Sequence, residues 1–257
     1  MNTQNSHNVP LIAVIIPALN EEEAIGKVLG DLPWDMLDQV IVVDNGSTDR
    51  TAQVATDAGA RVVREDEKGY GAACLAGIRA LHDADIVVFL DADYSDHPEE
   101  LSHVVKPILD DQADLVIGSR MQGNREKGAL LPQAFFGNWL AVTLIRWLYG
   151  VRYTDLGPFR AIRWTSLNRL GMRDRDFGWT VEMQVRAARQ GLRSCEVPVS
   201  YRYRVGQSKI TGTLRGTICA GYKILLTIFR HGFPIRMKDR RARCNAATRR
   251  VASQRVT

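Results

Sequence analysis

The chain has 257 residues, of which 45% are hydrophobic and 25% are charged, and its formal net charge at pH 7 is +5. This is an ordinary globular composition, and the length fits one large α/β domain or two small ones. A core of that size is buried without disulfide or metal staples. The cysteines are scattered singly, without the spacing of a zinc site, which favours reduced thiols in a cytoplasmic compartment. They are Cys74, Cys195, Cys219 and Cys244.

Neither end of the chain carries a segment that we expect to cross a membrane. The first nine residues, MNTQNSHNV, are polar and lack the apolar core of a signal peptide. The longest apolar stretch near the end, ICAGYKILLTIF, contains Lys223 and is shorter than the roughly 20 apolar residues of a spanning helix. An amphipathic helix over 214–235 and an arginine-rich tail over 236–257 suit an anionic membrane surface; a disordered, solubilising tail is the alternative.

Taken in chain order, the first 120 residues alternate between strand patterns and helix patterns. The predicted strands cover 11–18, 39–44, 60–65, 85–91 and 113–120, and the predicted helices cover 21–32, 50–59, 69–84 and 98–111. The strands are apolar and rich in β-branched residues, as in a sheet that is buried on both faces. The alternation therefore predicts a doubly wound, mostly parallel α/β sheet.

The pattern changes after Arg120. A polar loop over 121–132 precedes a predicted helix over 135–150, a turn and strand over 154–164, and a second helix over 178–191. An edge strand over 193–204, a loop over 205–213 and a final helix over 217–229 follow. Because no linker rich in Pro, Ser or Gly separates the two halves, we expect this half to pack on the same sheet.

Acidic residues follow several of the predicted strands. In open parallel sheets, ligands bind beyond the carboxyl ends of the strands, where this chain carries Glu21, Asp44, Asp91 and Asp93. Taken singly, Glu21 or Asp44 is more readily explained as a helix cap or a turn former than as a binding residue. Asp91 and Asp93 are one residue apart, so their side chains point the same way in an extended chain, and they repel unless a cation lies between them. Hard oxygen ligands suit Mg²⁺ or Mn²⁺, and the pair predicts a metal that binds a diphosphate.

Other phosphate-binding motifs are absent from the sequence. No GxxxxGK[ST] occurs, and PALNEEE stands after the first strand where a dinucleotide fold would have GxGxxG. No GxSxG marks a nucleophile elbow. A nucleic-acid partner is also not expected, since the body of the chain has no basic stripe with interleaved aromatic residues.

Five motifs in order carry a resemblance: VIIPALNEE, IVVDNGSTDRT, EKGYGAA, VVFLDADYSDHPEE and LVIGSR. Together they resemble the inverting family 2 glycosyltransferases, most of all the dolichyl- and polyprenyl-phosphate sugar synthases. The resemblance covers 13–120 and continues through TDLGPFRAI, GWTVEMQVRAARQG and RVGQSK to about residue 213. It implies a GT-A fold over 10–213, with a nucleotide-binding N-terminal half and an acceptor-side C-terminal elaboration. It also implies a UDP- or GDP-linked sugar donor and Mg²⁺ or Mn²⁺.

The resemblance also assigns roles to residues of this chain. It implies that Asp91 and Asp93 bind the metal, that Arg120 contacts phosphate, and that Glu182 is a general base. Pairing of Arg120 with one of the acids at the strand ends, and stabilisation of a helix N-terminus by Glu182, are the alternatives. The catalytic residues are then Asp93, Glu182 and Arg120. The residues implied to bind the nucleotide sugar are Pro17, Ala18, Asn20, Glu21, Asp44, Lys68, Asp91, Ala92, Arg204 and Lys209.

Two positions depart from the pattern of the lipid-phosphate branch. Ser95 stands where a Gln often follows the second acid, and LLPQAFFGNW offers no basic residue on the acceptor side. The motifs predict an inverting glycosyltransferase whose acceptor is a polyprenyl phosphate, located in the cytoplasm or peripherally on the inner face of the cell membrane. A soluble transferase acting on a hydroxyl of a small molecule or cell-envelope precursor is the main alternative. A nucleotidyltransferase and a non-catalytic module that binds a sugar nucleotide also stay open.

Overall fold

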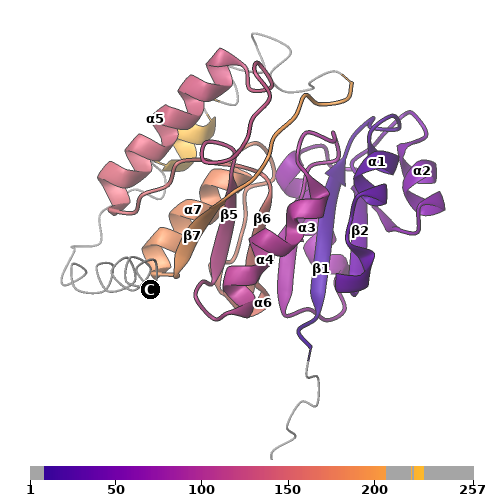
Figure 1. Cartoon of the computed structure of the whole chain (residues 1–257), viewed down its shortest axis with the longest axis horizontal. Coiled ribbons are helices and arrows are strands. Elements are labelled where there is room, and N and C mark those ends of the chain that lie inside the picture. The colour runs from indigo at the N-terminus through magenta and orange to yellow at the C-terminus, as the bar shows by residue number, and fades with distance from the viewer. Residues whose placement is uncertain (1–8, 207–220, 222, 229–257) are drawn as a thin grey trace, which may run out of the picture.

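A computed structural model describes residues 9–206, 221 and 223–228 (Figure 1). Its centre is a seven-stranded sheet in the order β3-β2-β1-β4-β6-β5-β7. Only β6 runs antiparallel to its neighbours β4 and β5. The strands are β1 (Ile12–Ala18), β2 (Gln39–Asp44), β3 (Arg61–Arg64), β4 (Ile86–Phe89), β5 (Leu115–Ser119), β6 (Arg160–Arg163) and β7 (Ser194–Pro198).

Helices cover both faces of this sheet. The helices are α1 (Ile25–Gly30), α2 (Thr51–Asp57), α3 (Tyr70–Ala80), α4 (Leu101–Leu109), α5 (Pro132–Tyr149), α6 (Trp164–Leu170) and α7 (Trp179–Gln190). Short 3-10 turns cover Trp34–Met36 and Pro98–Glu100. Successive residues of β1 point to opposite faces: Val14 packs in the core with α1, α2 and α4, and Ile15 packs in the core with α3, α5, α6 and α7. The prediction of a doubly wound, mostly parallel sheet is confirmed.

The C-terminal half belongs to the same sheet. Its two strands flank β5, with β6 inserted between β4 and β5 and β7 at the edge, where an edge strand was predicted. The short helix α6 was not predicted. Residues 221 and 223–228 are helical, within the predicted final helix. Lys209, the rest of that helix and the tail over 236–257 lie outside the described residues.

The first predicted helix is shorter than its sequence pattern. It was expected over 21–32, but α1 begins at Ile25, because residues 22–24 form a turn that brings Glu21 against α2. There the backbone N–H of Glu21 donates to Thr51 Oγ1 at 2.7 Å. Among the described helices, none is long and apolar enough to span a bilayer. Because β1 pairs in parallel with both β2 and β4, the carboxyl ends of these three strands meet at one rim of the sheet, where Ala18 lies opposite Asp44.

Candidate active site

A cavity of about 290 Å³ lies at this rim. It is lined by residues that follow β1, β2 and β4, by the start of α3, by the loop before α7 and by the segment after β7. The lining residues are Pro17, Ala18, Leu19, Glu21, Asn45, Lys68, Gly69, Tyr70, Ala73, Asp91, Ala92, Asp93, Asp176, Phe177 and Arg204. The structure thus brings together most of the residues predicted to bind a nucleotide sugar, from segments up to 187 positions apart in the chain.

Asp91 and Asp93 lie at the mouth of β4, as the sequence predicts. Asp93 Oδ1 accepts hydrogen bonds from the backbone N–H and the hydroxyl of Ser95, at 2.9 and 2.6 Å. Asp91 Oδ1 is buried and has no hydrogen-bond partner among the described residues. Burial, and then the neighbouring Asp93 carboxylate, raise the pKa of Asp91 to about 7. A buried carboxylate oxygen without a donor, beside a second carboxylate, is a site that favours a cation.

The donor set also fits a particular class of cation. Within the described part of the chain, no group of three or more His, Cys, Asp or Glu side chains is arranged to hold a metal. Mg²⁺ and similar ions usually bind one or two protein carboxylates and complete their shell with water and substrate phosphate oxygens. Two carboxylates in a cavity large enough for a ligand therefore suit a metal that arrives with a diphosphate.

Arg204 forms the cationic wall of the cavity. Its Nη1 lies 3.2 Å from Asp93 Oδ2 and its Nη2 lies 3.3 Å from Glu21 Oε1. Two backbone hydrogen bonds fix the segment that carries it, from the N–H of Val205 to the carbonyl of Asp93 and from the N–H of Arg202 to the carbonyl of Ser95. Because of these bonds, the guanidinium of Arg204 is held directly beside the acidic pair.

Arg202 anchors the same segment from outside the cavity. Its guanidinium lies 3.5 Å from the centre of the Tyr94 ring and donates to the carbonyls of Tyr94 and Asp96. Tyr94 itself adopts a positive φ of 63°. The loop after β4 and the segment after β7 are thereby joined along their length, so that the position of Arg204 depends on that of Asp93.

Two predicted nucleotide-binding residues stand beside the cavity and do not line it. Asp44 Oδ1 accepts from the N–H of Ser47 at 2.9 Å, and its Oδ2 lies 3.5 Å from Arg64. Asn20 Oδ1 accepts from the N–H of Thr48 at 2.8 Å. Both side chains shape the turns around the rim. Their predicted contacts with the nucleoside stay predictions.

Asn45 is a lining residue that the sequence prediction missed. Its side chain donates to the carbonyls of Glu65 and Glu67 and accepts from the N–H of Gly69. It therefore ties the end of β2 to the start of α3 and positions the loop that carries Lys68. Its place directly after the acid that ends β2 was the available signal.

The wall opposite β1 comes from the loop before α7, and this contribution was also missed. Asp176 and Phe177 line the cavity from this loop. The carbonyl of Arg175 accepts from the N–H of Ala72, and a Cβ atom added at Gly71 would lie 2.1 Å from the carbonyl oxygen of Asp174. The glycine-containing start of α3 thus lets this loop approach closely, which the glycine spacing alone did not reveal.

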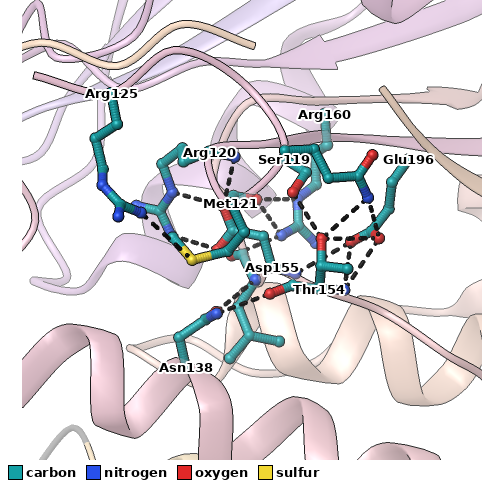
Figure 2. Close-up of polar contacts among 12 residues, drawn as sticks. Ser119, Arg120, Met121, Arg125, Asn138, Thr154, Asp155, Arg160 and Glu196 are labelled. Carbon is teal, nitrogen blue, oxygen red and sulfur yellow. Dashed lines mark hydrogen bonds and ion pairs between the residues drawn. The ribbon is translucent and has the colours of Figure 1, made fainter. Parts of the chain in front are cut away.

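Arg120 lies outside the cavity lining, in an ion pair with Asp155 (Figure 2). Its Nε and Nη2 lie 2.8 and 2.7 Å from the two carboxylate oxygens, and its backbone N–H donates to Oδ2. The guanidinium also lies 5.1 Å from the centre of the Tyr201 ring. The alternative of an ion pair therefore describes Arg120 in this conformation, although its partner is not one of the acids predicted at the rim.

Glu182 lines a second cavity, of about 430 Å³, and is only 2% exposed. Its Oε2 accepts from the backbone N–H groups of Arg173 and Asp174, at 3.0 and 2.7 Å, and its Oε1 accepts from Arg186 Nε at 2.7 Å. These contacts hold the loop that supplies Asp176 to the first cavity. The lining of the second cavity comprises Arg173, Asp174, Arg175, Glu182, Arg186, Lys223, Leu226 and Thr227.

The contacts of Glu182 lead to a test of its role. We expect Glu182→Gln to lower the free energy of unfolding by about 1.5–3 kcal/mol, because the amide cannot replace a buried carboxylate that binds Arg186 and two N–H groups. Urea unfolding measures this loss of stability, and kcat at saturating substrate measures the catalytic rate of the enzyme that remains folded. A loss of kcat of about 10²-fold or more at unchanged stability would identify Glu182 as a general base instead. Arg186→Met is the matched control, since it breaks the same ion pair and leaves the carboxylate.

Comparison with known proteins agrees with this geometry. The family model described as glycosyl transferase family 2 matches residues 13–171. An uncharacterized glycosyltransferase of Mycobacterium tuberculosis is 40% identical over 217 residues, which cover 81% of this chain and 94% of that protein. A dolichyl-phosphate hexose transferase of Haloferax volcanii is 34% identical and covers 77% of this chain and 86% of its own. An undecaprenyl-phosphate mannosyltransferase of Micrococcus luteus is 30% identical, over 90% of this chain and 98% of that protein.

The fold has solved counterparts as well. Glucosyl-3-phosphoglycerate synthase from Mycobacterium tuberculosis, in complex with Mn²⁺ and uridine-diphosphate-glucose, matches with a TM-score of 0.67 and 25% identity, over 87% of this chain and 79% of that one. The order of strands in the sheet, the cavity at its rim and the family match all agree with a glycosyltransferase. The chain belongs to glycosyl transferase family 2 and has a GT-A fold.

Proposed function

We propose that the chain transfers a hexosyl group, with inversion, from a nucleotide-diphosphate sugar to the phosphate of a polyprenyl phosphate. The observation that carries the donor half is the cavity at the rim of the sheet. In it, Asp91 Oδ1, which has no hydrogen-bond partner among the described residues, lies near the guanidinium of Arg204. The acceptor half is supported by the two relatives whose names specify dolichyl phosphate and undecaprenyl phosphate, each matched over most of its length.

Different residues of the cavity bind different parts of the donor. Pro17, Ala18 and Glu21 frame the nucleoside, and Lys68 lies on the side of the base and diphosphate. Asp91 and Asp93 would hold Mg²⁺ or Mn²⁺, which neutralises the charge that develops on a diphosphate leaving group. Arg204 adds a guanidinium at the same place, which stabilises the same developing charge.

Transfer needs an acceptor oxygen on the face of the sugar opposite the diphosphate. An oxygen of the acceptor phosphate forms a bond to the anomeric carbon while the bond from that carbon to the donor diphosphate breaks, and the nucleoside diphosphate leaves. A phosphate acceptor is already anionic, so this step needs no general base. The engagement of Glu182 with Arg186 and the 173–174 backbone is compatible with such a reaction. A lipid acceptor would also locate the reaction at the inner face of the cell membrane.

One observation favours a second candidate, a transferase with a small, soluble acceptor. The solved structure with 25% identity is a glucosyl-3-phosphoglycerate synthase, and Asp176 offers a carboxylate inside the cavity that could act as a base toward a hydroxyl. Lys209, which the resemblance implies to bind the nucleotide sugar, would act in the same way with either acceptor.

Donor binding and acceptor choice are tested in two steps. We expect one UDP- or GDP-linked sugar to raise the melting temperature in the presence of Mn²⁺, because a ligand at 100 times its Kd stabilises by about 2.7 kcal/mol. That corresponds to a shift on the order of 5–10 °C for a chain of this size. Without Mn²⁺ the shift should largely disappear.

The stabilising donor is then offered with a polyprenyl phosphate or with 3-phosphoglycerate. Formation of a sugar-linked lipid supports the proposal, and transfer to 3-phosphoglycerate alone supports the second candidate. If no sugar nucleotide stabilises the protein with or without metal, the donor assignment is wrong.

A further inference from the structure

The outer side of α5 exposes large aromatic side chains. Phe135, Phe136, Trp139 and Trp147 are 48%, 60%, 53% and 79% exposed. With about 100° of rotation per residue, the four side chains fall within an arc of about 120° on one side of the helix, with Trp147 nearly in line with Phe136. We call these four residues the aromatic face of α5. The opposite side of the helix packs into the core through Asn138, Ala141, Val142 and Ile145.

This face lies at the periphery of the molecule. Figure 1 shows α5 as a long helix at the upper left; it packs against α7, and Tyr149 Oη donates to the carbonyl of Ile228. Large aromatic side chains that are exposed on one side of a helix in this way mark an interaction site. Two of the rings are in contact with each other, with the centres of Phe136 and Trp139 5.8 Å apart.

Three exposed arginines lie on or beside the helix that carries the aromatic face. The sequence of α5 contains no Asp or Glu, and Arg146 is exposed in its last turn. Arg125 lies with its guanidinium 5.9 Å from the centre of the Phe135 ring, and Arg152 follows the helix as a further exposed cation. Trp residues beside cations, on a helix parallel to the surface, suit the interface of an anionic bilayer.

We propose that the aromatic face of α5 is a docking surface for an anionic phospholipid bilayer. The charges favour this occupant over a second copy of the chain. In a two-fold dimer the same face meets itself, so Arg146 and its counterpart would approach each other with no acid on the helix to pair with. Lipid phosphates, in contrast, provide the opposite charge, and the bilayer interface accepts indole rings.

The buried side of α5 connects this surface to Arg120 (Figure 2). Asn138 Nδ2 donates to the carbonyl of Thr154 at 2.9 Å, and Asn138 Oδ1 accepts from the N–H of Leu156 at 2.8 Å. Between these two residues stands Asp155, which binds Arg120 in two places. A helix resting on a bilayer would therefore hold Arg120 at a fixed height above the lipid phosphates. This last step rests on the proposed lipid acceptor, whereas the docking itself does not.

The test is co-sedimentation of the full chain with vesicles of phosphatidylglycerol and phosphatidylcholine. We expect binding that weakens in pure phosphatidylcholine and at high salt. Trp139→Ser together with Trp147→Ser should lower the partition coefficient by about tenfold or more, because two indoles no longer enter the interface. Leu109→Ser, on α4 at the other face of the sheet, is the matched control, and it should leave binding unchanged.

A second pair of variants reports on position instead of affinity. Trp139→Phe with Trp147→Phe should keep vesicle binding and lose most of the fluorescence quenching by lipids brominated on their acyl chains. Donor-induced thermal shifts should be the same in all variants, which shows that they fold and separates this proposal from the assignment of the donor.

Three results would overturn the docking proposal. The first is an absence of vesicle binding by the unmodified chain. The second is a partition coefficient that is unchanged by the two Trp→Ser substitutions, since another segment of the chain would then bind the vesicles. The third is a dimer, seen by light scattering without vesicles, that the Ser variants dissociate, because the aromatic face would then be covered by a second copy.

Discussion

Asp91→Asn is expected to lower kcat/KM by about 10³-fold or more and to remove the effect of Mn²⁺ on donor binding. The amide keeps the shape of the side chain but cannot neutralise a divalent cation. Burial and the Asp93 carboxylate raise the pKa of Asp91 despite the opposing effect of Tyr70, Arg120 and Arg204, so replacing the charge by a neutral amide should preserve or improve folding. Calorimetric titration with the sugar nucleotide, with and without Mn²⁺, measures the loss.

Asp96 provides a stringent control for this substitution. It is also a buried acid after β4, and neither of its carboxylate oxygens has a hydrogen-bond partner in the described part of the chain. It does not line the cavity. Burial, and then the Asp91 carboxylate, raise the pKa of Asp96 well above its ordinary value, which favours the protonated side chain that Asn resembles. Asp96→Asn should therefore keep donor binding within about fivefold. Equal losses in both variants would contradict a specific role for Asp91.

Gly71→Ala is expected to lower the free energy of unfolding by about 2–3 kcal/mol and to weaken donor binding by about tenfold or more. The added Cβ would lie 2.1 Å from the carbonyl oxygen of Asp174, which is backbone and has no rotamer that relieves the overlap. The loop that supplies Asp176 and Phe177 must then move away from α3, and the cavity loses its wall. Urea unfolding and donor titration measure the two effects separately.

Gly30→Ala is the matched change in another helix. A Cβ at this position meets no atom within 4 Å, so the substitution should be neutral or stabilise the protein by about 0.5–1 kcal/mol. If Gly71→Ala unfolds at the same urea concentration as Gly30→Ala and binds the donor normally, the close approach of the loop is not needed for the site.

Much of the fold and half of the site followed from the sequence because their signals are local. The strands β1, β2 and β4 are largely continuous apolar runs, and the two acids that follow β4 are separated by a single residue in the chain. Parallel strands bring their carboxyl ends together, so the rim needs no knowledge of distant contacts.

The remainder of the site depends on contacts between distant segments. Arg120 and Asp155 are 35 positions apart, and nothing in either segment indicates that they pair. Asp176 and Phe177 reach the cavity only because Gly71 admits their loop. No local pattern records such a close approach.

The position of β6 was hidden for a related reason. The strand has only four residues, RAIR, and it begins and ends with arginine, a residue type that is usually exposed to solvent. The side chain is in fact fully buried and donates to the carbonyls of Leu156, Gly157 and Thr180. Burial lowers the pKa of Arg160 to about 10. A charged residue in the middle of a sheet is compatible with burial only when tertiary structure supplies enough acceptors.

Under the proposed function, the ion pairs of Arg204 would make binding of the cation and binding of the nucleotide cooperative. A free divalent ion that binds Asp93 must separate that carboxylate from the guanidinium, which then has only Glu21 as a partner. An ion that enters with a diphosphate brings a new anion for Arg204, so the displaced guanidinium is paired again. Each ligand should therefore raise the affinity for the other by the same factor.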